Sequence, residues 1–134
     1  MSKGCHIVNV ASQAAFLPLP YMNLYAATKA FVYSYTRSLK SELKSSGIKV
    51  TAVCPGWIKT NLLPETLNGK KVTYPFIAKA ENVAKKAIKD AKKGKALSSY
   101  KFFVRAFIWQ QRHMNTSLAI KIWTLLIRKF VKNN

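Results

Sequence analysis

Two short apolar runs, separated by a long segment with helical periodicity, limit this chain to the α/β class of folds. Residues 5–11 and 48–54 are rich in Ile and Val, a composition typical of buried β-strands. Residues 24–44 carry apolar side chains at helical spacing, and Gly47 ends this segment. A strand–helix–strand unit places its two strands in parallel. We therefore predict a parallel sheet in which both strands are buried.

The long helix is predicted to start after Asn23, because Asn is a common N-cap residue. Two of its faces are apolar: one is a stripe of larger side chains, and the other consists of small residues. The stripe contains Phe31, Tyr35, Leu39 and Leu43, and the small residues are Ala26, Ala27 and Ala30. Small side chains allow close approach of a second helix or ordinary packing against the sheet, and the sequence leaves both alternatives open.

A long connection, residues 57–80, follows the second predicted strand. It contains Pro64, Gly69 and Pro75 among mixed polar and apolar residues, so we predict an irregular loop with short helical turns. Long loops of this kind often close over a ligand. Trp57 and Leu62 are candidate substrate contacts, although packing is the simpler role for both.

The remaining part of the α/β unit is predicted to be one helix and one strand. The helix covers residues 81–93 and stops at Gly94, and the strand lies within residues 95–100. The inward-facing residues of this helix are predicted to be Val83, Ala84, Ala87, Ile88 and Ala91, with lysines on the outer face.

Three residues near the first strand and the long helix have the chemistry for proton transfer. Tyr25 and Lys29 are four residues apart, so a helix places their side chains on one face. A cation about 4 Å away, at an effective dielectric constant of about 20, contributes on the order of 4 kcal/mol, which favours the phenolate form of a tyrosine. Ser12 has no nearby His or carboxylate to activate it. Its predicted role is to hydrogen-bond a substrate oxygen beside Tyr25.

The order and spacing of these residues resemble the C-terminal half of a short-chain dehydrogenase/reductase. The matching motifs are Asn9-Val10-Ala11-Ser12, Tyr25-x-x-x-Lys29, Pro55-Gly56 and Thr60, within residues 1–97. The resemblance implies a Rossmann-like, doubly wound parallel sheet. It also implies interconversion of a carbonyl and an alcohol with NAD or NADP as cofactor, and a homo-oligomer formed through the helix at residues 24–44.

The resemblance also implies a role for each matched residue. Ser12 would hold the substrate oxygen, Tyr25 would exchange its proton, and Lys29 would hydrogen-bond the nicotinamide ribose. Tyr25 and Lys29 would thus contact the cofactor, and its nicotinamide side would be lined by Pro55, Gly56, Ile58 and Thr60.

The two cysteines are predicted to be structural. Cys5 and Cys54 lie in the predicted strands and have neither metal-ligand nor disulfide-like spacing. Buried reduced thiols are therefore expected, as in a cytoplasmic protein. We predict no metal site.

The glycine-rich motif T-G-x-x-x-G-x-G, with which members of that family begin, is absent from this sequence. Such a motif lets the backbone approach a pyrophosphate at a helix N-terminus. The glycines here are too far apart for this: Gly4, Gly47, Gly56, Gly69 and Gly94. We therefore expect the chain to be part of a longer enzyme and to be inactive or incomplete by itself.

The charge balance is strongly basic, with 23 Lys and Arg against 4 Asp and Glu and a formal net charge of +19. No nucleic-acid-binding motif accompanies this charge, so nucleic acid is not the expected partner. No apolar run reaches the roughly 18 residues that a membrane-spanning helix requires.

Residues 101–134 are predicted to form a basic, amphipathic helical tail after an α/β domain at residues 1–100. Within residues 116–132, one side carries Ala119, Ile122, Trp123, Leu126, Ile127 and Phe130, and the other carries Lys121, Arg128 and Lys132. This pattern is typical of a helix on an anionic membrane surface, and it fits docking on the missing half of the enzyme or on a dimer partner equally well. The alternative function is a non-catalytic membrane-surface module that retains the motif as a relic.

Overall fold

The computed structural model describes residues 4–61, 63, 66–67, 70–71, 74 and 76–132, and for residues 66–67, 70–71 and 126–132 it describes the backbone alone. Its elements, in chain order, are β1 (His6–Val10), the 3-10 helix η1 (Gln13–Phe16), α1 (Asn23–Glu42), β2 (Lys49–Val53), β3 (Ile58–Lys59), β4 (Thr66–Leu67), β5 (Lys70–Lys71), β6 (Ala78–Lys79), α2 (Ala80–Lys92), β7 (Leu97–Ser98), α3 (Phe102–His113) and α4 (Thr116–Lys132).

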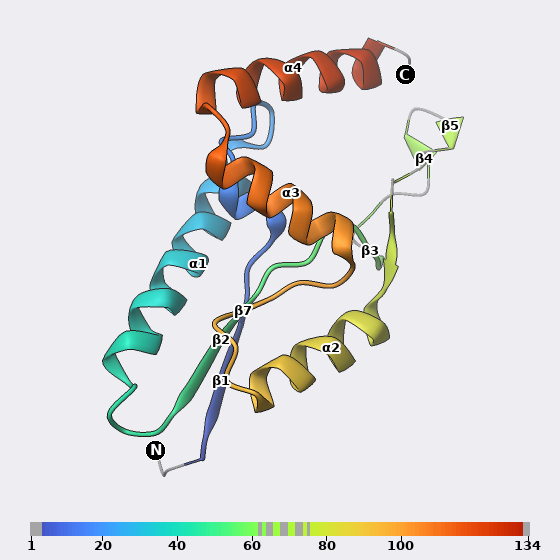
Figure 1. Cartoon of the computed structure of the whole chain (residues 1–134). Coiled ribbons are helices and arrows are strands. Elements are labelled where there is room, and N and C mark those ends of the chain that lie inside the picture. The colour runs from blue at the N-terminus through green and yellow to red at the C-terminus, as the bar shows by residue number, and fades with distance from the viewer. Residues whose placement is uncertain are drawn as a thin grey trace.

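A parallel sheet in the order β1-β2-β7 lies at the centre of the α/β unit. Val10 is paired with Val53, and Ala52 is paired with Leu97. Helix α1 lies on one side of the sheet and α2 on the other (Figure 1). The predicted strand–helix–strand unit, the last short strand and the Rossmann-like, doubly wound arrangement are therefore confirmed.

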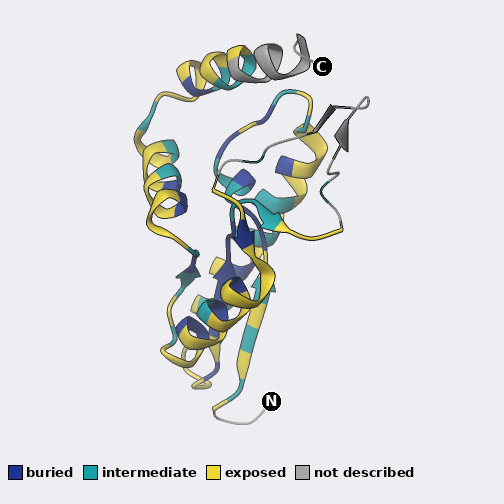
Figure 2. Ribbon diagram, turned by 90° about the vertical axis from the view of Figure 1, so that its right-hand side faces the viewer, coloured by how far each residue is buried: buried dark blue, intermediate teal, exposed yellow. Residues whose placement is uncertain are grey.

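Strand β1 is less buried than predicted. Strand β2 is buried from Val50 to Val53, whereas β1 alternates between exposed and partly buried residues. Val8 is 41% exposed and Val10 is 59% exposed, and Figure 2 shows this strand in yellow and teal. The reason is its position: β1 is an edge strand of the described sheet, so its face away from α1 is only partly covered.

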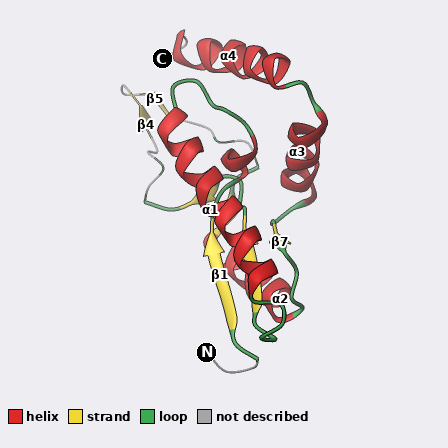
Figure 3. Cartoon of the chain, turned by 90° about the vertical axis from the view of Figure 1, so that its left-hand side faces the viewer, coloured by secondary structure: helices red, strands yellow, loops and turns green. Residues whose placement is uncertain are grey.

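Helix α1 is rotated relative to the sequence-based expectation. Phe31 and Tyr35 were predicted to form its apolar stripe, but both are exposed and their rings stack on each other at 6.2 Å. The sheet-facing side instead includes the buried Thr36. The side-chain amide of Asn9 in β1 donates to the Thr36 hydroxyl at 3.1 Å. A polar contact between strand and helix is therefore part of the packing of α1, which crosses in front of β1 in Figure 3.

Gly47 and Gly94 follow the ends of α1 and α2 as predicted, but Asn23 is not the N-cap of α1. Gly47 and Gly94 have φ values of 69° and 68° after α1 and α2, in the left-handed region that favours glycine. Asn23 is the first residue of α1, and the cap position is Met22, which makes no side-chain cap hydrogen bond. The Asn23 oxygen accepts the adjacent Leu24 N–H at 2.7 Å.

Helix α2 buries three of its predicted residues and one that was not predicted. Val83, Ala87 and Ala91 are buried, but Ala84 and Ile88 are exposed. Asp90 is buried because Lys86 and Lys95 form ion pairs with its carboxylate.

The connection before α2 forms short strands instead of helical turns in its described part. Strand β3 pairs with β6 in parallel, and β4 pairs with β5 in antiparallel orientation. Trp57 packs on Tyr74 with ring centroids 5.1 Å apart. Leu62, Pro64, Gly69 and Pro75, which the sequence analysis singled out, lie outside the described residues.

The tail packs on the α/β unit of the same chain. Val104 and Ile108 of α3 join a core cluster with Ala52 of β2. In α4, Ala119 is buried in a second cluster with residues of the loop before α1, and the Trp123 indole N–H donates to the Pro20 carbonyl at 3.3 Å. The tail thus docks within one chain, an arrangement that differs from the two expected docking partners, the missing half of the enzyme and a dimer partner. None of the described helices is long and apolar enough to cross a membrane.

Candidate active site

The carboxyl ends of β1 and β2 bring two loops together. Pairing continues beyond the strands: Ala11 N–H donates to Val53 O at 2.8 Å, and Gln13 N–H donates to Pro55 O at 2.9 Å. These bonds hold Ser12 beside the Pro55–Gly56 turn. Parallel sheets commonly place their ligand sites at this edge.

Ser12 is buried and its hydroxyl has a defined orientation. The Ser12 oxygen accepts the backbone N–H of Ala14 at 3.1 Å, so it caps η1. A serine hydroxyl has two acceptor positions and one donor proton. Among the described residues, nothing accepts the Ser12 proton, so the hydroxyl is able to donate to a further group.

Tyr25 and Lys29 lie in the first two turns of α1 and share one face, as predicted. The Lys29 ammonium group is 5.8 Å from the centre of the Tyr25 ring. It donates a hydrogen bond to the Val10 carbonyl oxygen at 3.2 Å. Tyr25 is 40% exposed, so its ring is accessible to a ligand. The helix thus presents a phenol and a cation directly above the end of β1.

These side chains line a single cavity of about 490 Å³, a size within the range of small-molecule sites. The predicted site residues on its wall are Ser12, Tyr25, Lys29, Pro55, Gly56, Ile58 and Thr60. Ser12 and Thr60, which are 48 positions apart in the sequence, therefore line the same cavity.

Gly56 has a packing role in addition to its place on the cavity wall. A Cβ atom at this position would lie 2.9 Å from Val104 Cγ2 and 3.1 Å from Gln13 Oε1. Any side chain would therefore push against both the start of α3 and the loop that carries Ser12.

The structure adds wall residues that the sequence analysis did not assign to the site. They include Leu17, Leu19 and Met22 before α1, Phe107 of α3 and Trp123 of α4. Trp57, a candidate contact, also lines the cavity. Phe107 and Trp123 belong to the tail, and only its docking places them here. The amphipathic pattern of residues 116–132, which includes Trp123, was visible in the sequence, but the surface that this helix covers was not.

The polar side chains on the cavity wall include the hydroxyl groups of Ser12, Tyr25 and Thr60 and the ammonium group of Lys29. Cys54, at the end of β2, is fully buried, and burial raises the pKa of its thiol to about 12 despite the nearby Ser12 N–H, Arg112 and Lys29. The thiol is therefore protonated at neutral pH and is not a nucleophile. In the part of the chain that the structure describes, no three His, Cys, Asp or Glu residues gather as metal ligands.

Comparison with known proteins reveals consistent similarities. The family model for short chain dehydrogenase matches residues 1–71. Probable oxidoreductase EphD of Mycobacterium tuberculosis is 43% identical over 63 residues, which cover 47% of this chain and 11% of that protein. Very-long-chain 3-oxoacyl-CoA reductase of Rattus norvegicus is 40% identical over 90 residues, or 66% of this chain and 26% of that protein.

Solved structures show the same relationship. The short-chain dehydrogenase from Sphingobium yanoikuyae in complex with NADPH aligns with a TM-score of 0.63 and 32% identity, covering 75% of this chain and 39% of that one. This chain therefore spans less than half the length of each of these three proteins.

Proposed function

Because this chain belongs to the short-chain dehydrogenase family, we propose that it supplies the catalytic part of an NAD(P)-dependent oxidoreductase that interconverts a carbonyl and an alcohol. The observation that carries the proposal is the single cavity in which Ser12, Tyr25 and Lys29 meet the Pro55–Gly56 turn. A hydroxyl donor, a phenol and a fixed cation around one cavity suit proton transfer to or from a substrate oxygen.

We assign a role in the proton transfer to each of three side chains. The Ser12 hydroxyl donates a hydrogen bond to the substrate oxygen and holds it in the cavity. The Tyr25 hydroxyl gives its proton to that oxygen during reduction and takes it back during oxidation. The Lys29 ammonium group, 5.8 Å from the ring centre, favours the phenolate that forms when the proton leaves.

The cavity also has a wall that suits a nicotinamide cofactor. We assign Pro55, Gly56, Ile58 and Thr60 to its nicotinamide side and Lys29 to its ribose. The donors fit, because ammonium and hydroxyl groups bind ribose and amide oxygens. When bound, NAD or NADP supplies or accepts the hydride. The complex of the Sphingobium yanoikuyae dehydrogenase with NADPH supports the choice of a nicotinamide cofactor.

The remaining wall favours a substrate with an apolar body. Leu17, Leu19, Met22, Phe107 and Trp123 surround the cavity on the side of the loop before α1 and the tail. Apolar walls with a few polar groups orient a ligand through those groups. We therefore propose a carbonyl compound with an aliphatic or ring-containing body, and the name of the rat relative, an oxoacyl-CoA reductase, agrees with this class.

Two contacts complete the proposal. Exposed apolar residues of α1, namely Leu24, Phe31 and Tyr35, support a homo-oligomer formed through this helix. Peripheral contact of α4 with anionic membranes stays a prediction. Its Ala119 and Trp123 pack on the chain itself, and among the α4 side chains that the structure describes, Leu118, Ile122 and Leu125 are exposed and apolar. Leu126, Ile127 and Phe130 lie outside the described side chains. Co-sedimentation with anionic liposomes tests this contact.

The activity is tested with a fusion in which the glycine-rich half of a short-chain dehydrogenase precedes this chain, called the fused protein below. It is incubated with NADPH deuterated at the transferable position and with a panel of apolar ketones. We expect deuterium at the carbinol carbon of the product. A fused protein that binds NADPH but transfers no deuterium to any ketone of the panel contradicts the proposal.

A further inference from the structure

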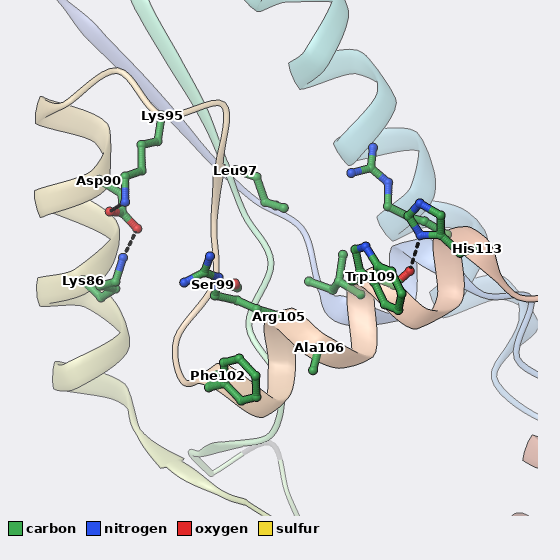
Figure 4. A pocket seen from close by; sticks show the side chains of 12 residues that line it. Lys86, Asp90, Lys95, Leu97, Ser99, Phe102, Arg105, Ala106, Trp109 and His113 are labelled. Carbon is green, nitrogen blue, oxygen red and sulfur yellow. Dashed lines mark hydrogen bonds and ion pairs between the residues drawn. The ribbon is translucent and has the colours of Figure 1, made fainter.

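A second concave surface lies on a different face of α3 from the active-site cavity. It is a groove of about 980 Å³ between α2, the segment after β7 and α3 (Figure 4). Phe107 of α3 points to the active-site cavity, whereas Arg105 and Trp109 line this groove. We propose that the groove binds a nucleoside phosphate.

The charge of the groove favours an anion. Lys86, Lys95, Arg105 and Arg112 line it, and Asp90 is its only carboxylate among the described residues. Asp90 is already satisfied, because Lys86, Lys95 and the Ser98 hydroxyl all bind it. The positive charge therefore exceeds what the fold itself requires.

Arg105 is the group best placed to hold a phosphate. Its guanidinium group makes no hydrogen bond or ion pair with any other described residue, and Figure 4 shows the side chain extending from α3 across the groove toward Ser99. A guanidinium group presents paired N–H donors that match two oxygens of a phosphate. At the end of the groove, Arg112 is held by the Tyr33 hydroxyl at 3.2 Å.

Aromatic rings beside these cations favour a ligand that also has a flat ring. Trp109 is 66% exposed, and its indole stacks on His113 with centroids 4.7 Å apart. Phe102, on the same helix, is 74% exposed. A nucleobase stacks readily on an exposed indole. Arg105 and Trp109 are four residues apart on α3, so their Cβ atoms lie roughly 5–6 Å from each other, close enough for one nucleotide to contact both.

The test uses the full chain and three probes: ADP, inorganic phosphate and adenosine, each titrated by calorimetry. We expect ADP to bind with saturation, and phosphate and adenosine to bind at least about tenfold more weakly, because each supplies only one of the two contacts. Equal affinity for ADP and phosphate, or no saturable ADP binding, overturns the proposal. Self-association through β1 would leave this groove accessible, because β1 and β7 are at opposite edges of the sheet.

Matched variants locate the site. Arg105→Ala should weaken ADP binding by about tenfold, and Trp109→Ala should reduce the affinity for ADP toward that for phosphate. Arg37→Ala removes the same charge from an exposed position on α1 and should leave ADP binding within about twofold. Circular dichroism verifies that each variant is folded.

Two results would contradict this location. Equal losses in Arg37→Ala and Arg105→Ala would mean diffuse attraction to a basic surface, of the kind that also binds nucleic acid. A loss in Lys29→Ala without a loss in Arg105→Ala would place the nucleotide in the active-site cavity instead.

Discussion

The ammonium group of Lys29 donates a hydrogen bond to the carbonyl oxygen of Val10 across 3.2 Å, which joins α1 to the carboxyl end of β1. This contact places the cation above the loop that carries Ser12 and keeps it 5.8 Å from the centre of the Tyr25 ring. One side chain therefore connects the helix to the strand and also sets the charge of the proposed site.

Replacing Lys29 tests whether this side chain has the proposed chemical role or only anchors α1 to β1. In the fused protein, Lys29→Ala should lower both kcat and the affinity for NADPH, because the cation and the proposed ribose contact are lost together. Lys40→Ala is the control, since Lys40 is on the same helix and donates to the Gly94 carbonyl at 2.8 Å. It should cost about 1 kcal/mol of stability and leave both kinetic quantities unchanged. Similar kinetic losses in the two variants would argue against a chemical role for Lys29.

Ser12→Ala should reduce kcat by about 100-fold, because a donor to the reacting oxygen is lost. It should also cost about 1 kcal/mol of unfolding free energy, because the cap of η1 is removed. Ser98→Ala is the matched control: this buried serine ends β7 and donates to Asp90 at 2.8 Å. It should lower stability similarly and leave kcat unchanged. Steady-state kinetics and urea unfolding measure both effects, and an unchanged kcat in Ser12→Ala would refute the assignment.

The site was predictable from sequence because it depends on local pattern and simple topology. Ser12 follows β1, the Pro55–Gly56 turn follows β2, and parallel strands end at the same edge. The i,i+4 spacing of Tyr25 and Lys29 then fixes their common face. Four motifs in order were therefore enough to predict residues that line one cavity.

Features that depend on long-range packing were not predictable in this way. Trp123 meets Pro20 across 103 positions of sequence, and an amphipathic helix pattern does not name the surface that it covers. A charged residue such as Asp90 is normally expected on the exposed face of a helix. It is buried here because Lys86, Lys95 and Ser98 all bind its carboxylate. The division of the chain at residue 100 stays a prediction.

Asp90 should make stability depend on pH in acid. Burial alone would raise the pKa of its carboxyl, but hydrogen bonds from Lys86, Lys95 and Ser98 outweigh burial and lower that pKa from 3.8 to about 2. Because the pKa is lower in the folded state, this carboxylate stabilises the fold above about pH 4, and the contribution disappears as the pH falls toward about 2. The expected contribution is about 2 kcal/mol.

Urea unfolding of the wild type and of Asp90→Asn at several pH values measures this effect. The difference in unfolding free energy between the two proteins should shrink as the pH falls from about 5 to about 2. Glu81→Gln, at an exposed position of α2, serves as the control. A difference that is constant over this range would show that Asp90 is not the responsible group.

The unpaired edge of β1 and its exposed valines should make the isolated chain self-associate. Val8 and Val10 are 41% and 59% exposed on an edge strand, and such an edge attracts further strands. Val8→Lys should shift the chain toward monomer in sedimentation velocity experiments. Ile88→Lys, at an exposed apolar position of α2, should not. A monomeric wild type, or equal effects of both substitutions, would contradict association through β1.

The most direct measurement of the proposed chemistry is the kinetics of Tyr25→Phe in the fused protein, with NADPH binding measured on the same samples. The substitution removes the phenol oxygen and retains the ring that lines the cavity. We expect kcat for ketone reduction to fall by about 100-fold to 10,000-fold, while the affinity for NADPH changes by no more than about threefold. Turnover that stays within a few-fold of the wild type, with NADPH still bound, would show that Tyr25 does not transfer the proton.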